Sequence, residues 1–170
     1  MRIDNSELID FLSVIDRALT SKIRLTAVGG TAMTLLKLKE STIDVDFELS
    51  NGDYKIFKQA LRETPHGFKV DLFVDGLIFS QQLPEDFLDS SIAVKTTLKN
   101  IRLFALHPLD IVVTKIGRLN DRDIQDIDSC IHQFGLVKSE IKARAASVEY
   151  TGNRELYKKN LAFVLKKFWK

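Results

Sequence analysis

Two short groups of residues in this chain have the chemistry of a phosphate-transfer site. Gly29-Gly30-Thr31 is followed thirteen residues later by Asp44-Val45-Asp46, and Asp71 stands within a later apolar run. A glycine turn that opens a helix presents backbone N–H groups to an anion. Two aspartates one residue apart on a strand point to the same face and repel each other unless a cation lies between them. Mg²⁺ prefers carboxylate and phosphate oxygens, so the pattern predicts a magnesium-dependent phosphate-transfer site.

Each part of this pattern also has a plain structural explanation. A double glycine between a strand and a helix is most often only a turn. An Asp-x-Asp pair on an alternating strand is most often the wet face of a sheet, which Glu48 would extend as a solvated carboxylate. Asp71 fits such an explanation less well, because the run around it favours burial, although Lys69 shares its face and could neutralise it. If two strands bring the three acids together, a cation site explains them better than an apo cluster of repelling charges.

The elements that would position these residues follow from hydrophobic periodicity. The pattern predicts strands at 23–28, 43–49 and 68–74, with helices at 6–20, 31–39 and 54–62 and a turn at Asn51-Gly52. In the strand at 43–49, Ile43 belongs to the apolar side. Further short strands are expected at 77–79, 92–98 and 101–106, one helical turn at 84–88, and helices at 108–118, 121–134, 138–149 and 153–168. This order predicts an α/β (α+β) core at residues 1–107 with a mixed sheet and flanking helices, and a helical C-terminal part at 108–170 packed on it as a single compact unit.

Composition limits the class of protein. At 170 residues and 19.3 kDa, with 45% hydrophobic and 28% charged residues, the chain is typical of one soluble globular domain. No apolar run approaches the ~20 residues of a membrane span, and the N-terminus does not resemble a signal peptide. Cys130 is the single cysteine, so no internal disulfide is possible and a cytoplasmic location is expected. With only three dispersed histidines (His66, His107 and His132), a zinc site is not expected.

The net charge of +2 conceals an asymmetry. Residues 136–170 contain nine Lys or Arg and three Glu, which gives +6. The first 135 residues therefore carry 16 basic against 20 acidic residues, or −4. A basic tail on an acidic body fits a surface that attracts a polyanion such as RNA, and it also fits two well-solvated surface helices. The apolar stripe of the last predicted helix indicates core contact or a homodimer seam.

Four stretches together resemble the nucleotidyltransferase superfamily. They are Ala27–Ala32, Ser41–Phe47, Pro108–Lys115 and Arg122–Ile127, and the likeness extends over residues 8–135. Within the superfamily, the chain looks most like the small prokaryotic minimal nucleotidyltransferases and the nucleotidyltransferase toxins of toxin–antitoxin pairs. The resemblance implies the nucleotidyltransferase fold with a helical C-terminal extension.

The resemblance also implies an activity. It is the Mg²⁺-dependent transfer of a nucleoside monophosphate from an NTP to a hydroxyl of RNA, such as the 3′ end of a tRNA, or of a partner protein. That partner could be a cognate antitoxin or toxin, and no membrane is involved.

Residue roles follow from the same resemblance. Asp44, Asp46 and Asp71 would be the catalytic and metal-binding acids, holding two Mg²⁺ ions. Gly29, Gly30, Thr31 and Lys115 would bind the nucleotide phosphates, and Asp123 would support them. From the residues alone, Lys115 could instead be a solvated helix lysine, and Asp123 could pair with Arg118 or Arg122.

Two positions depart from the family pattern. Relatives commonly carry serine where this chain has Gly30, and often arginine where it has Glu40. The loss of a hydroxyl and of a positive charge favours an alternative function. In that alternative, the chain is a catalytically inactive nucleotidyltransferase-fold protein that binds a nucleotide or a partner.

Overall fold

The computed structural model describes all 170 residues, and they divide into two compact units. The first holds Met1–Asp75 and Ser91–Leu106, and the second holds Gly76–Ser90 and His107–Lys170. The chain therefore leaves the first unit, returns to it and leaves it again. The last crossing lies between Leu106 and His107, and Gly76–Ser90 groups with the C-terminal helices.

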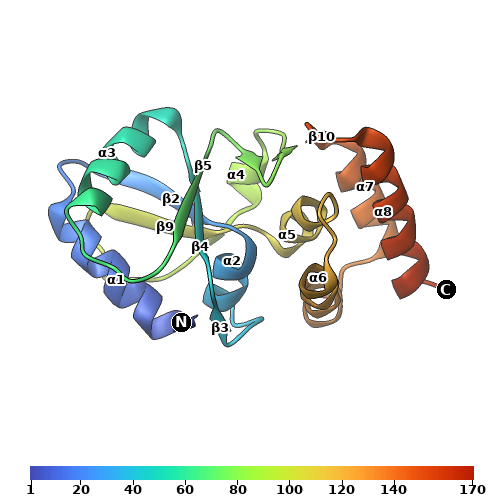
Figure 1. Cartoon of the computed structure of the whole chain (residues 1–170), viewed down its shortest axis with the longest axis horizontal. Helices are drawn as coiled ribbons and strands as arrows, with labels where there is room; N and C mark the ends of the chain where they lie inside the picture. The colour runs from blue at the N-terminus through green and yellow to red at the C-terminus, as the bar shows by residue number, and fades with distance from the viewer. The chain divides into compact units, whose positions relative to one another are not determined.

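The first unit is built on a five-stranded mixed sheet with strand order β5-β4-β2-β9-β8 (Figure 1). β4 pairs in parallel with β5 and antiparallel with β2, while β9 pairs in parallel with β2 and antiparallel with β8. β4 is an inner strand, and all five of its residues are buried. The strands are β2 (Ile23–Ala27), β4 (Val45–Leu49), β5 (Val70–Val74), β8 (Ile92–Ala93) and β9 (Ile101–Ala105); β1 (Ile3–Asp4) and β3 (Ser41–Thr42) form a separate two-stranded sheet.

Three helices belong to this unit: α1 (Asn5–Ala18), α2 (Gly29–Leu35) and α3 (Asn51–Arg62). α1 and α3 contact each other beside the sheet (Figure 1). The ring of Phe57 on α3 meets the ring of Phe47 on β4 edge-on, with 6.0 Å between centroids. The apolar side of β4 therefore faces this helix, and the side that carries Asp46 and Glu48 faces the opposite way.

Several local predictions need correction. The Asn51-Gly52 pair is the first turn of α3 and not a loop, because the Ser50 hydroxyl accepts a hydrogen bond from the Asp53 N–H (3.2 Å) and caps the helix. The helix predicted to continue to residue 39 ends at Leu35, followed by Lys37 in the left-handed region (φ +61°). Ile43 is 38% exposed and lies outside the core.

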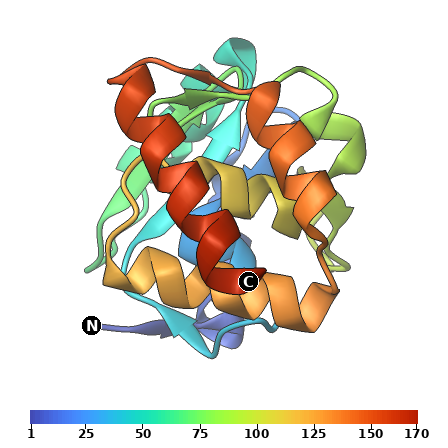
Figure 2. The ribbon, with the colours of Figure 1, turned by 90° about the vertical axis from the view of Figure 1, so that its right-hand side faces the viewer.

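The second unit consists of five helices and a small sheet (Figure 2). The short strand predicted at 77–79 is present at Leu77–Ile78, and it pairs with Gln81–Gln82 in the order β10-β7-β6. The range predicted for α6 is confirmed, and this helix ends at Gly135 with φ +67°. The elements are β6 (Leu77–Ile78), β7 (Gln81–Gln82), α4 (Phe87–Ser90), α5 (Pro108–Lys115), α6 (Asp121–Phe134), α7 (Lys138–Ala146), β10 (Glu149–Tyr150) and α8 (Arg154–Phe168). No helix of either unit has the length and apolar character of a membrane span.

An arginine joins three segments of this unit. Arg144 on α7 donates two hydrogen bonds to the buried Asp110 carboxylate on α5 (2.5 and 3.2 Å) and one to Asp86 before α4 (3.0 Å). Burial disfavours the guanidinium charge, but the two carboxylates outweigh burial and raise the pKa of Arg144 above its ordinary value. The contact therefore ties Gly76–Ser90 to the C-terminal helices.

Candidate active site

The register of two parallel strands brings two of the predicted acids together. Asp46 on β4 is paired with Asp71 on β5. Adjacent strands lie about 4.8 Å apart and paired residues project to one face, so both carboxylates leave the sheet side by side. Asp46 is 6% exposed, whereas the Asp71 side chain is 39% exposed and lies 3.4 Å from the Lys69 ammonium. The predicted convergence of these two strands and the neutralising role of Lys69 are confirmed.

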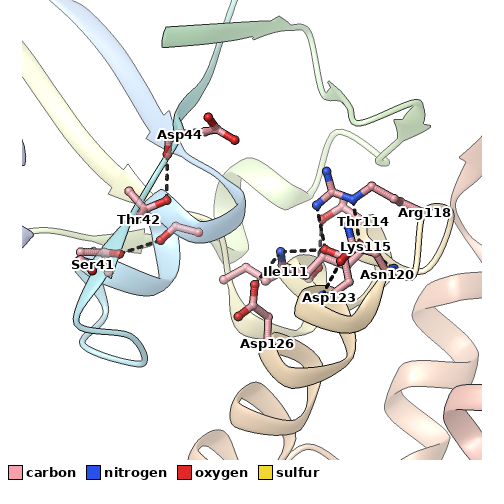
Figure 3. Close-up of polar contacts among 12 residues, drawn as sticks. Ser41, Thr42, Asp44, Ile111, Thr114, Lys115, Arg118, Asn120, Asp123 and Asp126 are labelled. Carbon is pink, nitrogen blue, oxygen red and sulfur yellow. Dashed lines mark hydrogen bonds and ion pairs between the residues drawn. The ribbon is translucent and has the colours of Figure 1, made fainter. Parts of the chain in front are cut away.

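Asp44 takes a different position from the other two acids. It lies just before β4, and the residue is exposed. Its carbonyl oxygen accepts a hydrogen bond from the Thr42 hydroxyl (2.8 Å), and Figure 3 shows its carboxylate pointing away from that contact. No three His, Cys, Asp or Glu side chains of the protein are grouped so that they could hold a metal ion together. The three-acid, two-ion arrangement therefore stays a prediction.

The Thr31 hydroxyl connects the glycine turn to the Asp-x-Asp segment. It is fully buried, donates a hydrogen bond to the Asp44 carbonyl (3.2 Å) and accepts one from the Asp46 N–H (2.9 Å). A hydroxyl has one hydrogen to donate, and a phosphate oxygen would need that hydrogen. The hydroxyl is thus used to fix the backbone on both sides of Val45.

The glycine turn is closely packed. Gly29 opens α2 with φ +54°, a left-handed conformation that a glycine adopts without strain. At Gly30 a Cβ atom would lie 2.7 Å from the Thr42 hydroxyl oxygen and 3.9 Å from the Lys39 ammonium. Thr42 is buried, so its hydroxyl occupies the space that a serine side chain at position 30 would need. The departure from the family serine therefore has a steric reason in this chain.

Sequence reasoning missed two polar residues of this unit. Glu48, expected to be solvated, is 3% exposed, and its neighbours on the flanking strands are Thr26 and Phe73. It is a second buried carboxylate on the face of Asp46. Lys39 brings a positive charge to the glycine turn that Glu40 does not provide. The covering of this face of β4 and the early end of α2 decide these placements, and neither shows in the local pattern.

The predicted phosphate-binding lysine is buried in the second unit. Lys115 at the end of α5 is 4% exposed, and its ammonium lies 3.4 Å from Asp123 and 3.0 Å from Asp126 on α6. Arg118 makes two hydrogen bonds to Asp123, both 2.8 Å long. Figure 3 shows Lys115, Arg118 and Asp123 close to one another, with Asp126 beside Lys115. The alternative in which Asp123 pairs with Arg118 is confirmed, whereas a contact between Lys115 and phosphate stays a prediction.

Asp123 also takes part in the capping of the N-terminus of α6. Its carboxylate accepts a hydrogen bond from the Asn120 N–H (3.1 Å), while the Asn120 side chain accepts one from the Asp123 N–H (2.9 Å), forming a capping box. Burial alone would raise the pKa of Asp123, but the hydrogen bonds and charges of Arg118 and Lys115 lower it below its ordinary value. Asp123 is thus an ionised, fully buried anchor for α6.

Cys130 on the same helix is fully buried. Burial raises the pKa of its thiol to about 12, with a smaller opposing effect from Lys115. Such a thiol is a packing group and not a nucleophile.

Comparison with known proteins agrees with the geometry. Residues 6–134 match the model of a family described as nucleotidyltransferase of unknown function (DUF6036). Among solved structures, the chain is similar to an antigenic nucleotidyltransferase-like protein from Paracoccidioides brasiliensis, with a TM-score of 0.52, 18% sequence identity, and coverage of 98% of this chain and 95% of that chain. No curated protein matches the sequence. At this identity the structural similarity concerns the fold, and it confirms the predicted mixed α/β architecture.

Proposed function

We propose that this chain, which belongs to the family described as nucleotidyltransferase of unknown function, transfers a nucleoside monophosphate from an NTP to a hydroxyl group. The acceptor oxygen attacks the α-phosphorus, the bond from that phosphorus to the bridging oxygen of the β-phosphate breaks, and pyrophosphate leaves. The acceptor loses its proton in this step.

The observation that carries the proposal is the Asp46–Asp71 pair beside the glycine turn. The two residues are partners on neighbouring strands, and the Thr31 hydroxyl holds the Asp46 N–H against the start of α2. Strand pairing and the Thr31 hydrogen bond therefore fix the positions of the two acids relative to the glycine turn within the first unit. A site that must hold a triphosphate and an attacking hydroxyl in line needs this kind of fixed geometry.

The acidic residues fit magnesium that arrives with the nucleotide. Mg²⁺ is usually bound by one or two carboxylates together with substrate phosphates and water, and not by a complete protein cage. Paired carboxylates on adjacent strands supply that number, which is consistent with the absence of a three-acid group. When bound, Mg²⁺ would neutralise the charge that develops on the transferred phosphoryl group and the leaving oxygen.

The chain's own residues then have distinct tasks. Asp46 and Asp71 would bind the metal, Asp71 would also accept the proton of the acceptor hydroxyl, and the exposed Asp44 would add a third carboxylate on the nucleotide side. Gly29 and Gly30 would present backbone N–H groups to the phosphates.

Two further residues of the first unit support this arrangement. Lys39, whose ammonium lies over Gly30, would compensate phosphate charge. Thr31 would position Asp46.

The acceptor is proposed to be RNA, with the 3′ end of tRNA as the first candidate. A hydroxyl of a partner protein, within a toxin–antitoxin pair, is the second. The basic C-terminal region supports RNA, because phosphate contacts supply much of nucleic-acid affinity.

The test uses NTPs labelled at either the α- or the γ-phosphate, with Mg²⁺ and bulk tRNA or a cell lysate as acceptor. We expect α-label to appear on the acceptor and γ-label to be released as pyrophosphate. Asp46→Asn and Asp71→Asn should each reduce transfer by about 100-fold or more, because charge stabilisation at the reacting group is lost. Asp10→Asn, an exposed acid on α1, is the matched control and should leave transfer unchanged.

A non-catalytic nucleotide-binding module is the second candidate. It is favoured by the absence of a three-acid metal group and by the use of the Thr31 hydroxyl within the backbone. Equilibrium dialysis with Mg·ATP separates the two. Nucleotide binding that needs Asp46, with no α-label on any acceptor, would support the module and exclude the transferase.

A further inference from the structure

One side of α8 is fixed to its own unit by hydrogen bonds as well as by packing. The Tyr157 hydroxyl donates to the carbonyl of Val113 (2.9 Å), and the Asn160 amide donates to the carbonyl of Ile116 (2.8 Å), so both contacts end on α5 and the residue after it. Tyr157 and Val164 are the buried residues of the helix. Figure 2 shows α8 beside α7 and in front of α5. These contacts show which side of α8 packs against the other helices of its unit.

The outer side of α8 presents an aromatic ring among lysines. Phe163 is 50% exposed. Lys159 is four residues before it, and Lys166 and Lys167 are three and four residues after it, and all three lysines are exposed. Residues three and four apart on a helix are surface neighbours, so these lysines surround the Phe163 ring. Leu156, 44% exposed, completes what we call the lysine face.

The charge of this helix is not balanced within it. Arg154–Phe168 contains five basic residues and one acid, Glu155, so its formal charge is +4. Glu155 pairs with Lys158, which is outside the lysine face (3.5 Å). Lysines at neighbouring helix positions repel one another, and half of the Phe163 surface is left uncovered. Both features are accounted for by a partner that carries negative charge and a flat apolar ring.

We infer that the lysine face of α8 (Leu156, Lys159, Phe163, Lys166 and Lys167) docks single-stranded RNA. One unstacked base lies on the Phe163 ring and adjacent phosphates lie against the three lysines. Only an unpaired base exposes its flat surface to a side chain, which points to a single-stranded segment. Two exposed apolar side chains are too few for the core of a stable protein interface. The inference rests on the proposed function, because it selects RNA over a protein as the acceptor class.

The first test measures binding of a fluorescein-labelled twelve-nucleotide single-stranded RNA of mixed sequence to the full chain by fluorescence anisotropy, at several salt concentrations. Three phosphate contacts predict a slope of about −2 for log K against log salt, since each contact on a single strand contributes about −0.7. The variant K159E/K166E/K167E should lose this slope and bind at least about tenfold more weakly at 100 mM salt.

The control variant K22E/K55E/K95E has the same net charge and changes exposed lysines of the first unit only. It should bind the RNA within about twofold of the parent. If both triple variants weaken binding equally, the effect is that of net charge and the docking face is wrong. Circular dichroism and thermal melting of both variants test whether they fold.

The second test addresses the ring. Phe163→Ala should weaken RNA binding by about five- to thirtyfold, at the lower part of the range for base stacking. Phe163→Leu should lose about as much as Phe163→Ala, whereas Phe163→Trp should bind at least as well as the parent. Parent-like RNA binding by Phe163→Leu, or stronger binding of the parent to phosphatidylglycerol vesicles than to RNA, would overturn the inference.

The binding assay needs neither nucleotide nor turnover, so the two proposals fail separately. RNA binding without any transfer of label would leave the docking face intact and remove the transferase. Transfer to a protein acceptor, with no RNA binding that depends on the lysine face, would leave the transferase intact and remove the docking face.

Discussion

Single hydroxyl groups hold the backbone around the paired acids. Thr31 is fully buried and bonds on one side to the Asp44 carbonyl and on the other to the Asp46 N–H. The Asp44 carbonyl has a second donor in Thr42, whereas the Asp46 N–H has the Thr31 oxygen as its hydrogen-bond acceptor. A loss of the hydroxyl at position 31 therefore removes a buried hydrogen bond at the acid that the proposed chemistry needs.

This gives a prediction for two substitutions of similar size. Thr31→Val should lower the free energy of unfolding by about 1–3 kcal/mol, because two buried hydrogen bonds of the Thr31 hydroxyl are lost, and should reduce transfer activity through misplacement of Asp46. Thr31→Ser keeps the hydroxyl and should retain activity near that of the parent. Urea denaturation and the label-transfer assay measure both effects. Equal losses in the two variants would contradict the prediction, because they would show that the hydroxyl contributes no more than the methyl group.

Asp123 gives a prediction about pH. Its pKa is lowered in the folded state, so its stabilisation is fully present above the ordinary value of 3.8 and is lost as pH falls through the lowered folded pKa. Asp123→Asn should therefore cost about 3–5 kcal/mol of unfolding free energy at pH 7, because Arg118 and Lys115 lose a buried partner.

The cost of Asp123→Asn should shrink when unfolding is measured near pH 2.5. Asp128→Asn is the control, since Asp128 is exposed and pairs only with His132 at the surface. It should change stability by less than about 1 kcal/mol at either pH. A cost of Asp123→Asn that does not vary with pH would contradict the ionised anchor.

At the scale of elements, the start of α2 and the β3 strand are fitted to each other. A Cβ on Gly30 would come within 2.7 Å of the Thr42 hydroxyl oxygen. Gly30→Ala should therefore lower the free energy of unfolding by about 1–3 kcal/mol through overpacking. In a Thr42→Ala background, where the obstructing atom is gone, the same substitution should cost much less. A double-mutant cycle measured by urea denaturation tests this coupling, and additive losses would show that the contact is relieved in some other way.

The sequence predicts these elements unevenly, for physical reasons. The strong alternation of residues 43–49 and the apolar run around Asp71 identify β4 and β5, and the order of glycines and acids predicts that these strands meet. The same alternation misplaces Glu48, because alternation separates two faces but does not tell whether the second face is covered. Lys37 ends α2 early through a backbone angle that composition does not reveal.

The charged cluster of the second unit was partly predictable. The spacing of Arg118 and Asp123 allows a pair between the end of α5 and the start of α6, and that pair is present. The burial of Lys115 was not predictable, because it depends on Asp126 and Asp123 facing it from another helix. Tertiary contacts of this kind leave no local signal.

At the scale of the whole molecule, the second unit is built from two separated stretches of chain. Gly76–Ser90 contributes β6 and β7, and β7 pairs with β10 far along the sequence. Two-residue strands have no detectable periodicity, so a sequence pattern assigns this stretch to the unit that precedes it. The buried side chains of Ile78 and Phe87 show that it carries part of the core.

The interrupted chain predicts how the protein responds to truncation. A fragment ending at residue 107 keeps Gly76–Ser90 but removes β10 and the Arg144 partner of Asp86, which leaves apolar side chains of that stretch uncovered. We expect it to be less soluble than the intact chain. A fragment of residues 1–106 in which Gly76–Ser90 is replaced by a short Gly-Ser linker should be more soluble and show a more cooperative thermal transition. Equal behaviour of the two fragments would show that this stretch folds with the first unit.

The burial of Cys130 has a practical use. With its pKa raised to about 12 and its side chain inaccessible, this thiol should react very slowly with maleimides at neutral pH while the protein is folded. A second cysteine introduced on the outer surface, such as Ala162→Cys beside Phe163, would then be the one reactive position. A single fluorophore can thus be attached at a chosen position without prior removal of Cys130.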